Sequence, residues 1–307
     1  MIYRTLGKSG IQVSAVALGC MTLGTDRARA RRTLERALDL GVTLFDTADL
    51  YDHGVNEEIV GEVLRGARDR VVIATKVGNR WRADGSGWDW DPSGAYILQE
   101  VRESLRRLGV ERIDLYQLHG GTVDDPTDET VRAFELLLEQ GSIRAWGISS
   151  IRPNVVRRFC ALAASGRARL ASEMVQYSLL DRRPEEEILE TARGAGLGVL
   201  ARGAVASGLL AGPPLGKPAA KYLELDPSEV QSAQDALRSV AGSDGAMSAA
   251  AIRFCLGHPA VTAVVAGASS PQQVEANVRA ADAPPLSQAE ARLVRGAVRA
   301  LRYTAHR

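Results

Sequence analysis

Short apolar segments alternate with amphipathic segments along almost the whole 307-residue chain. Runs of this length are typical of buried strands when turn residues bound them. Strands are predicted at 13–19, 42–46, 71–76, 113–119, 143–149, 171–177, 197–202 and 261–267. Between them, apolar residues recur every three or four positions, which indicates helices that each bury one face.

The amphipathic segments predict a helix after nearly every strand. These helices are expected at 30–41, 56–66, 93–109, 127–141, 152–166, 184–196, near 228–241, 247–257 and 270–281, with a terminal helix at 286–301. Asn56 is a candidate cap, Gly41 and Gly66 are candidate stops, and Pro153 can open a helix. Residues 79–92 and 203–221 are predicted to be loops.

Eight strand–helix pairs in one register predict an α/β fold, a (β/α)8 TIM barrel with an additional C-terminal helix. We expect residues 1–307 to form a single barrel domain, because no linker or low-complexity tract divides them. The rival is a doubly wound sheet, which is expected to carry G-x-G-x-x-G after its first strand. Residues 19–26, GCMTLGTD, do not match that pattern.

The composition favours a soluble, cytoplasmic protein. Aromatic residues make up only 5% of the chain, so Ala, Leu and Val must build the core. A net charge of +1 gives no overall field for nucleic acid or an anionic membrane. The start, MIYRTLGKSG, does not read as a signal peptide, and no apolar run approaches the roughly 18 residues that span a bilayer. Three scattered cysteines fit reduced thiols.

Polar residues stand at the ends of three successive predicted strands. Asp46 ends the second strand, Lys76 the third and His119 the fourth, while Tyr51 lies in the loop after Asp46. Taken singly, each has a structural explanation: a turn cap, a surface lysine or a hydrogen-bonded histidine. In a barrel, however, the loops after the strands share one mouth. The four side chains would then interact strongly in a partly dry pocket.

This set of side chains suits proton transfer to an oxygen. A free tyrosine is a poor acid at neutral pH, and a neighbouring ammonium ion stabilises the phenolate. Lys76 would supply the ammonium ion, and Asp46 would compensate its buried charge. Tyr51 would then act as a general acid, with His119 orienting a carbonyl group. Carbonyl reduction also requires a hydride source, which implies a cofactor.

Five motifs each lie at the end of a predicted strand, and together they resemble those of the aldo-keto reductase superfamily. They are FDTADLY (45–51), VIATK (72–76), IDLYQLH (113–119), GISS (147–150) and VQYSLL (175–180). The resemblance extends from residues 4–24 to residues 264–278, nearly the whole chain. It implies hydride transfer between NADPH and an aldehyde or ketone without a metal. It also implies a catalytic tetrad of Asp46, Tyr51, Lys76 and His119, with Tyr51 as the proton donor in reduction and the base in oxidation.

The resemblance further implies a set of cofactor contacts. The nicotinamide carboxamide would be held by Ser149, Ser150 and Gln176, with the ring stacked on Tyr177. The pyrophosphate would lie against Ser207, Gly208 and Leu209, and the adenosine end against Gly267, Ser269, Gln273 and Asn277.

The cofactor implied is NADP, with NAD as the alternative. Relatives often carry Arg or Lys for the extra phosphate of NADP, whereas this segment has neither before Arg279, and Gln273 stands where an arginine is common. Ser149–Ser150 replaces the more usual Ser-Asn pair. Residues 120–126, GGTVDDP, also depart from the family, so they carry no expectation about the substrate.

Two other functions compete with this one. A nicotinamide-binding, redox-sensing subunit with slow turnover would keep the same tetrad. A metal-dependent hydrolase would need several histidines and acids at strand ends, and only His119 is so placed. Trp81, Trp88 and Trp90 either line a substrate wall or pack their loop onto the barrel. The physiological substrate, the reaction direction and the oligomeric state stay open.

Overall fold

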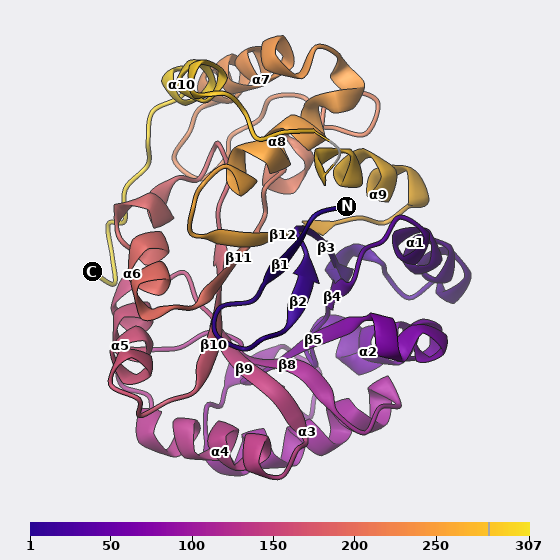
Figure 1. The fold of residues 1–307 in the computed structure, drawn as a ribbon, viewed down its shortest axis with the longest axis vertical. Helices are drawn as coiled ribbons and strands as arrows, with labels where there is room; N and C mark the ends of the chain where they lie inside the picture. The colour runs from indigo at the N-terminus through magenta and orange to yellow at the C-terminus, as the bar shows by residue number, and fades with distance from the viewer. Residues whose placement is uncertain (282) are drawn as a thin grey trace.

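A closed barrel of eight parallel strands forms the centre of the molecule (Figure 1). The computed structural model describes residues 1–281 and 283–307. The strands follow one another around the barrel in chain order: β3 (Val16–Gly19), β4 (Leu44–Asp46), β5 (Val72–Val77), β8 (Ile113–Leu118), β9 (Ile143–Ser149), β10 (Leu170–Gln176), β11 (Gly198–Arg202) and β12 (Val261–Gly267). The prediction of a TIM barrel is confirmed.

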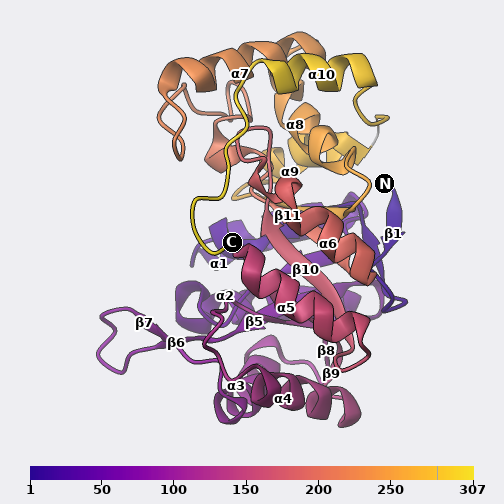
Figure 2. The same ribbon diagram turned by 90° about the vertical axis from the view of Figure 1, so that its left-hand side faces the viewer.

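A ring of helices surrounds the barrel (Figure 1). The ring consists of α1 (Arg27–Asp39), α2 (Val55–Leu64), α3 (Gly94–Leu108), α4 (Thr127–Glu139), α5 (Pro153–Ala164), α6 (Ile188–Ala195), α8 (Met247–Leu256) and α9 (Pro271–Val278). Two further helices, α7 (Pro227–Ala241) and α10 (Gln288–Gly296), pack against each other beyond α8 (Figures 1 and 2). The additional C-terminal helix is therefore present, but it ends well before residue 301. No helix in the described part of the chain is long and apolar enough to cross a bilayer.

Small apolar side chains fill the interior of the barrel. Ala17, Ala74, Ala145, Leu200 and Ala263 belong to one buried cluster inside the strands. A second, larger cluster lies between the strands and the helices. The interior of an eight-stranded barrel is narrow, so small aliphatic side chains can fill it. The core of this fold therefore needs few aromatic residues.

An N-terminal hairpin closes one end of the barrel, and the sequence did not predict it. The predicted strand at 13–19 is broken: Gln12–Ser14 forms β2, which pairs with β1 (Tyr3–Thr5), and only Val16–Gly19 enters the barrel. Leu6 and Ile11 of the hairpin are fully buried in the interior cluster. Gly7 has a φ of 52°, and a Cβ there would lie 2.5 Å from the Ala171 carbonyl oxygen, so a side chain does not fit.

A second hairpin projects from the opposite end of the barrel (Figure 2). It consists of β6 (Asn79–Trp81) and β7 (Trp88–Trp90), so the prediction of a plain loop at 79–92 is wrong. The two strands are only three residues long, too short to show an alternating pattern. The loop predicted at 203–221 contains one 3₁₀ turn, Ala206–Gly208.

Candidate active site

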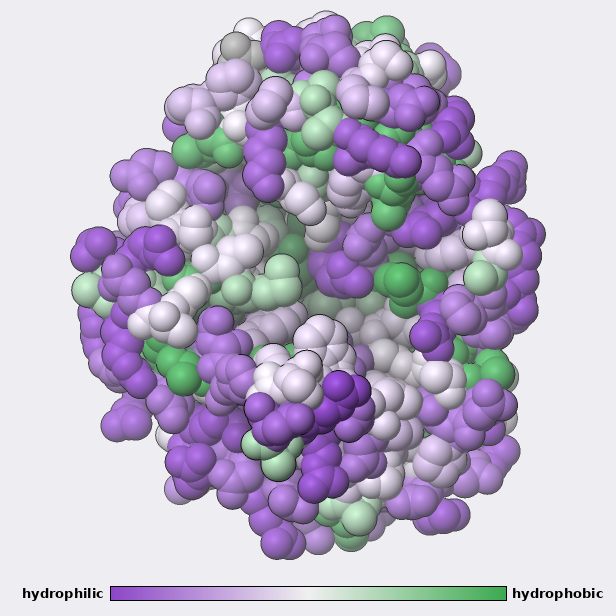
Figure 3. Space-filling view, turned by 180° about the vertical axis from the view of Figure 1, so that it is seen from behind, coloured by the Kyte–Doolittle hydropathy of each residue, from purple (hydrophilic) through white to green (hydrophobic). Residues whose placement is uncertain are grey.

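A cavity of about 970 Å³ opens at the carboxyl ends of the barrel strands, and residues that follow all eight strands line it. Figure 3 shows the corresponding hollow at the centre of the face opposite the β1–β2 hairpin. All four residues of the predicted tetrad line the cavity. Of the predicted cofactor residues, Ser149, Ser150, Gln176, Ser207, Gly208, Gly267, Ser269, Gln273 and Asn277 also line it.

The Lys76 ammonium group lies at the centre of the tetrad. Its Nζ donates hydrogen bonds to Asp46 Oδ1 at 2.5 Å and to the Thr47 carbonyl oxygen at 2.6 Å, and it lies 3.4 Å from the phenol oxygen of Tyr51. Lys76 is only 1% exposed. Burial alone would lower the pKa of this lysine, but the attraction of the Asp46 carboxylate outweighs it and raises the pKa. Lys76 is therefore a buried cation beside Tyr51.

Gln117 completes the ion pair and was missed by the sequence reasoning. Its Nε2 donates to Asp46 Oδ2 at 3.2 Å, and the side chain is fully buried. Gln117 is in β8, and His119 directly follows the end of that strand two positions later, so the two side chains face the same side. A polar residue at that spacing was the signal that could have revealed it.

An unusual turn places Tyr51 over Lys76. Asp52 and His53 have φ values of 50° and 54°, and Gly54 has 86°, so three successive residues are left-handed. For the two non-glycine residues this conformation costs about 1 kcal/mol or more each. The His53 ring stacks on Trp81 with centroids 3.7 Å apart, which opposes relaxation of the turn.

Buried Asn56 fixes the other end of this turn. Its Oδ1 accepts a hydrogen bond from Thr47 Oγ1 at 2.7 Å, and its Nδ2 donates to the Cys20 carbonyl oxygen at 3.0 Å. The predicted role of Asn56 as a helix cap is not observed, because Gly54 is the N-cap of α2. Asn56 instead ties the loop of Tyr51 to the loop after β3.

The imidazole of His119 is neutral. Burial, together with the positive charges of Lys76 and Arg202, lowers its pKa to about 3. Its ring lies edge-on to the Tyr51 ring, with centroids 6.1 Å apart. Asn79 Nδ2 donates to the His119 carbonyl oxygen at 2.9 Å and holds the backbone there. A neutral ring can donate one hydrogen bond without adding charge to the site.

We expect the His119 imidazole to remain unprotonated from about pH 5 to pH 8. Its proton NMR shifts, identified by their absence in the His119→Gln variant, should stay constant over that range. Since the pKa rises from about 3 in the folded protein to about 6.5 when unfolded, the group's contribution to stability is fully present above the higher value and declines as the pH falls between the two. A titration step between pH 5 and pH 8 would contradict this assignment.

The carboxamide-binding residues expected near the nicotinamide lie at adjacent strand ends. Ser149 and Ser150 are buried at the end of β9. The Gln176 amide lies between two charged groups: its Oε1 accepts from Arg202 Nη1 at 3.0 Å, and its Nε2 donates to Asp181 Oδ2 at 2.9 Å. Arg202 was missed, although it ends β11 in the position that marked the other candidates.

The predicted pyrophosphate loop is a tight turn. Ser207 and Gly208 have φ values of 57° and 93° and line the cavity. The Lys217 backbone N–H donates to the Gly208 carbonyl oxygen at 3.0 Å, and Lys217, which the sequence reasoning missed, also lines the cavity. Leu209 is buried and is not among the residues that line it.

The predicted adenosine segment is held by its own hydrogen bonds. Gln273 Oε1 accepts from both the backbone N–H and Oγ of Ser269, at 2.7 Å and 3.1 Å. Asn277 Nδ2 donates to the Gly267 carbonyl oxygen at 3.2 Å. These polar groups are therefore ordered at the β12 end of the cavity.

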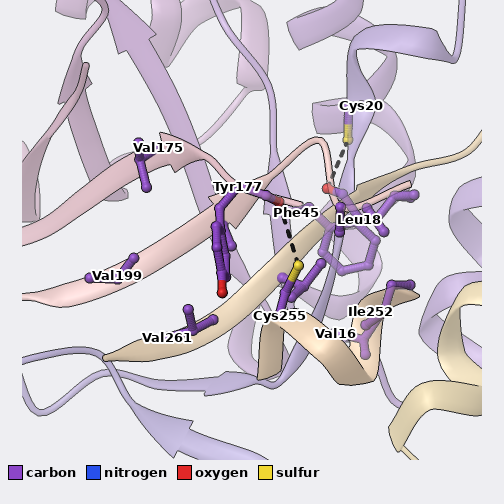
Figure 4. Packing of buried hydrophobic residues seen from close by; sticks show 14 of the residues in the cluster. Val16, Leu18, Cys20, Phe45, Val175, Tyr177, Val199, Ile252, Cys255 and Val261 are labelled. Carbon is purple, nitrogen blue, oxygen red and sulfur yellow. Dashed lines mark hydrogen bonds between the residues drawn. The ribbon is translucent and has the colours of Figure 1, made fainter. Parts of the chain in front are cut away.

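Tyr177 does not lie where the stacking prediction requires. Its ring is fully buried between the strands and α8, close to Cys255, Val199 and Val261 (Figure 4). Its hydroxyl donates to Glu185 Oε1 at 2.6 Å. Successive strand side chains point to opposite faces, so Gln176 faces the cavity and Tyr177 faces the helices. We therefore reject stacking of the nicotinamide ring on Tyr177.

The three tryptophans divide between the two explanations that the sequence left open. Trp88 and Trp90 line the cavity. Trp81 instead packs the hairpin onto the Tyr51 turn, and its Nε1 donates to the Leu50 carbonyl oxygen at 3.2 Å. Within the described residues, no cluster of three or more His, Cys, Asp or Glu side chains could hold a metal ion.

The fold and the cavity define a (β/α)8 barrel with a polar site at the carboxyl ends of its strands, and comparison with known proteins gives its family. Residues 15–299 match the model of the Aldo/keto reductase family. The chain therefore belongs to the aldo/keto reductase family, whose members are oxidoreductases that use nicotinamide cofactors.

Individual relatives agree with this family over nearly the full length. The chain is 44% identical over 311 residues to the "uncharacterized oxidoreductase" YqkF of Bacillus subtilis, covering 99% of both sequences. The holo form of aldo-keto reductase AKR11C1 from Bacillus halodurans matches with a TM-score of 0.91 and 46% identity, covering 100% of this chain and 99% of that one. A probable voltage-gated potassium channel β subunit of Oryza sativa is 31% identical, with 93% of each covered.

Proposed function

We propose that the protein transfers hydride between a nicotinamide cofactor and an aldehyde or ketone, or the corresponding alcohol, with Tyr51 as the general acid and base. The observation that carries this proposal is the position of the Lys76 ammonium group, 3.4 Å from the Tyr51 phenol oxygen and 2.5 Å from Asp46 Oδ1. These groups lie at a cavity that is large enough for a dinucleotide and a small substrate.

In the reduction direction, Tyr51 gives its proton to the carbonyl oxygen as negative charge develops there. The Lys76 cation stabilises the resulting phenolate, and the Asp46 carboxylate keeps that cation charged. Neutral His119 donates a hydrogen bond to the same oxygen and orients the carbonyl group. In oxidation the phenolate removes the alcohol proton, so the same groups serve both directions.

The residues around the cavity fit a dinucleotide. Ser149, Ser150 and Gln176 offer polar groups for a carboxamide, and the left-handed turn at Ser207–Gly208 presents the exposed Ser207 to the cavity where phosphates would lie. Lys217 and Arg202 line the cavity without a carboxylate partner among the described residues. When bound, the nicotinamide supplies the hydride that no side chain can provide.

We propose NADPH as the preferred reduced cofactor, because the cations of the cavity suit its additional phosphate. A titration followed by tryptophan fluorescence should give a lower Kd for NADPH than for NADH, and Lys217→Gln should weaken binding of NADPH by about tenfold and binding of NADH by less. Equal affinities for the two cofactors would replace this assignment with NAD use.

The direct test of the function is turnover of a carbonyl panel with each reduced cofactor. Many catalytic cycles per protein molecule, followed by loss of reduced-nicotinamide absorbance, are expected with at least one simple aldehyde. The similarity to a probable potassium channel β subunit supplies the second candidate, a redox-sensing subunit with slow turnover. Tight cofactor binding with no more than a single cycle would support that candidate instead.

A further inference from the structure

Arg152 is a cation in the cavity for which the proposed chemistry has no use. It follows the end of β9, lines the cavity and is partly buried. Its Nη1 donates to the Gly121 carbonyl oxygen at 2.9 Å, and this is the one hydrogen bond its side chain makes within the described part of the chain. The Nε–Nη2 edge of the guanidinium group therefore has no hydrogen-bond partner among the described residues.

No acidic side chain of the described residues neutralises this guanidinium group. Asp46 is the one acid among the described lining residues, and it pairs with Lys76. Asp125 of the adjoining loop is engaged elsewhere: it accepts from Thr122 N and Oγ1, each at 2.6 Å, and from Trp90 Nε1 at 2.9 Å. The unpaired edge of Arg152 therefore suits an anion supplied from outside the chain.

The cofactor phosphates do not account for this charge. The turn at Ser207–Gly208 follows β11 and the adenosine segment follows β12, whereas Arg152 follows β9 and is bonded to the loop after β8. One barrel strand, β10, therefore lies between the strand that precedes Arg152 and the strand that precedes the nearer of these segments. Its neighbours are instead the residues after His119, on the side where the carbonyl substrate must lie.

Arg152 belongs to one continuous wall of the cavity. A Cβ at Gly120 would lie 3.0 Å from Cζ3 of Trp90, so the indole covers the backbone that follows His119. Gly121 comes next and accepts the Arg152 hydrogen bond, and Ile151, 41% exposed, also lines the cavity. The wall thus presents an apolar surface that ends in a cation.

We infer that Arg152 selects carbonyl substrates that carry a carboxylate or phosphate group, with the reacting carbonyl at Tyr51, the apolar body against Trp90 and the anion on the guanidinium edge. This inference rests on the proposed function and deepens it. An arginine edge forms two parallel hydrogen bonds with a carboxylate or a phosphate, which makes it selective as well as attractive.

The test compares anionic and neutral aldehydes of similar size. In the wild type, kcat/KM should be higher for 4-carboxybenzaldehyde than for 4-nitrobenzaldehyde, although the nitro compound is the more electrophilic. Arg152→Gln should lower the ratio of the two values by about tenfold or more, since it removes a charge-assisted hydrogen bond. Arg152→Lys should restore part of the ratio. The same comparison of kcat/KM between glyceraldehyde 3-phosphate and glyceraldehyde tests a phosphate group.

A purely structural role for Arg152 gives a different result. If the side chain only holds the loop at Gly121, both members of a pair should lose activity equally and the ratio should not change. Arg158→Gln is the matched control, because Arg158 Nη1 similarly donates to the Val123 carbonyl oxygen at 2.5 Å but does not line the cavity. An unchanged ratio in Arg152→Gln overturns the inference. Absence of turnover with every aldehyde in the wild type would instead defeat the proposed function.

Discussion

Replacement of Tyr51 by Phe is expected to lower turnover by at least ~100-fold while the cofactor still binds. The substitution removes one hydroxyl group, which lies 3.4 Å from Lys76 Nζ, and leaves the ring in place. Without it, no acid stands beside the carbonyl oxygen as charge develops there. The loss should fall on kcat, because the proton moves only in the transition state.

The experiment requires both kinetic and binding measurements. Turnover with a good aldehyde is compared between the wild type and Tyr51→Phe, and the cofactor Kd is measured for each by fluorescence titration. Tyr3→Phe serves as the control, since it removes a hydroxyl group at the opposite, hairpin end of the barrel, where it bonds the Gly41 carbonyl oxygen. Retention of most of the activity in Tyr51→Phe would remove Tyr51 from its assigned role.

Replacement of Lys76 by Met should affect both activity and folding. Turnover should fall at least ~100-fold because the phenolate loses its stabilising cation. The free energy of unfolding should fall by about 3–5 kcal/mol, because Asp46 would keep a buried charge without its partner. Asp46 is only 4% exposed, so its carboxylate has little contact with water to offset the loss of the ammonium group.

The double variant Asp46→Asn/Lys76→Met separates these two effects. It removes both charges, so we expect it to recover much of the lost stability but none of the lost turnover. Urea denaturation and steady-state kinetics of the four proteins in this cycle provide the measurements. Equal stability losses in the single and double variants would show that the ion pair is not what Lys76 contributes to folding.

The candidate site was predictable where it depends on the barrel itself. Asp46, Lys76 and His119 each stand at the end of an apolar run, and a parallel barrel brings all such ends to one mouth. The same rule applied to β11 would have found Arg202. Tyr177 was misplaced because it adjoins Gln176 in a strand, and adjacent side chains point to opposite faces.

Other features could not be read from strand ends. The position of Tyr51 depends on a left-handed turn that buried Asn56 and the stacked pair His53–Trp81 hold in place. Lys217 reaches the cavity because its backbone bonds to Gly208, which lies nine residues earlier in the 3₁₀ turn of the same loop. The residues that form these contacts follow no periodic pattern in the sequence, so the pattern of apolar residues could not predict them.

The sequence by itself determined the (β/α)8 barrel and the family, because eight repeated apolar runs and five motifs in order leave few other arrangements. It also determined which strand ends deliver acid, lysine and histidine. Only the tertiary structure decided that Tyr177 turns away, that Trp88 and Trp90 line the cavity while Trp81 does not, and that Arg152 has an unpaired edge. Strand pattern is a local property of the chain, whereas pairing of charges and direction of loop side chains depend on neighbours that are distant in sequence.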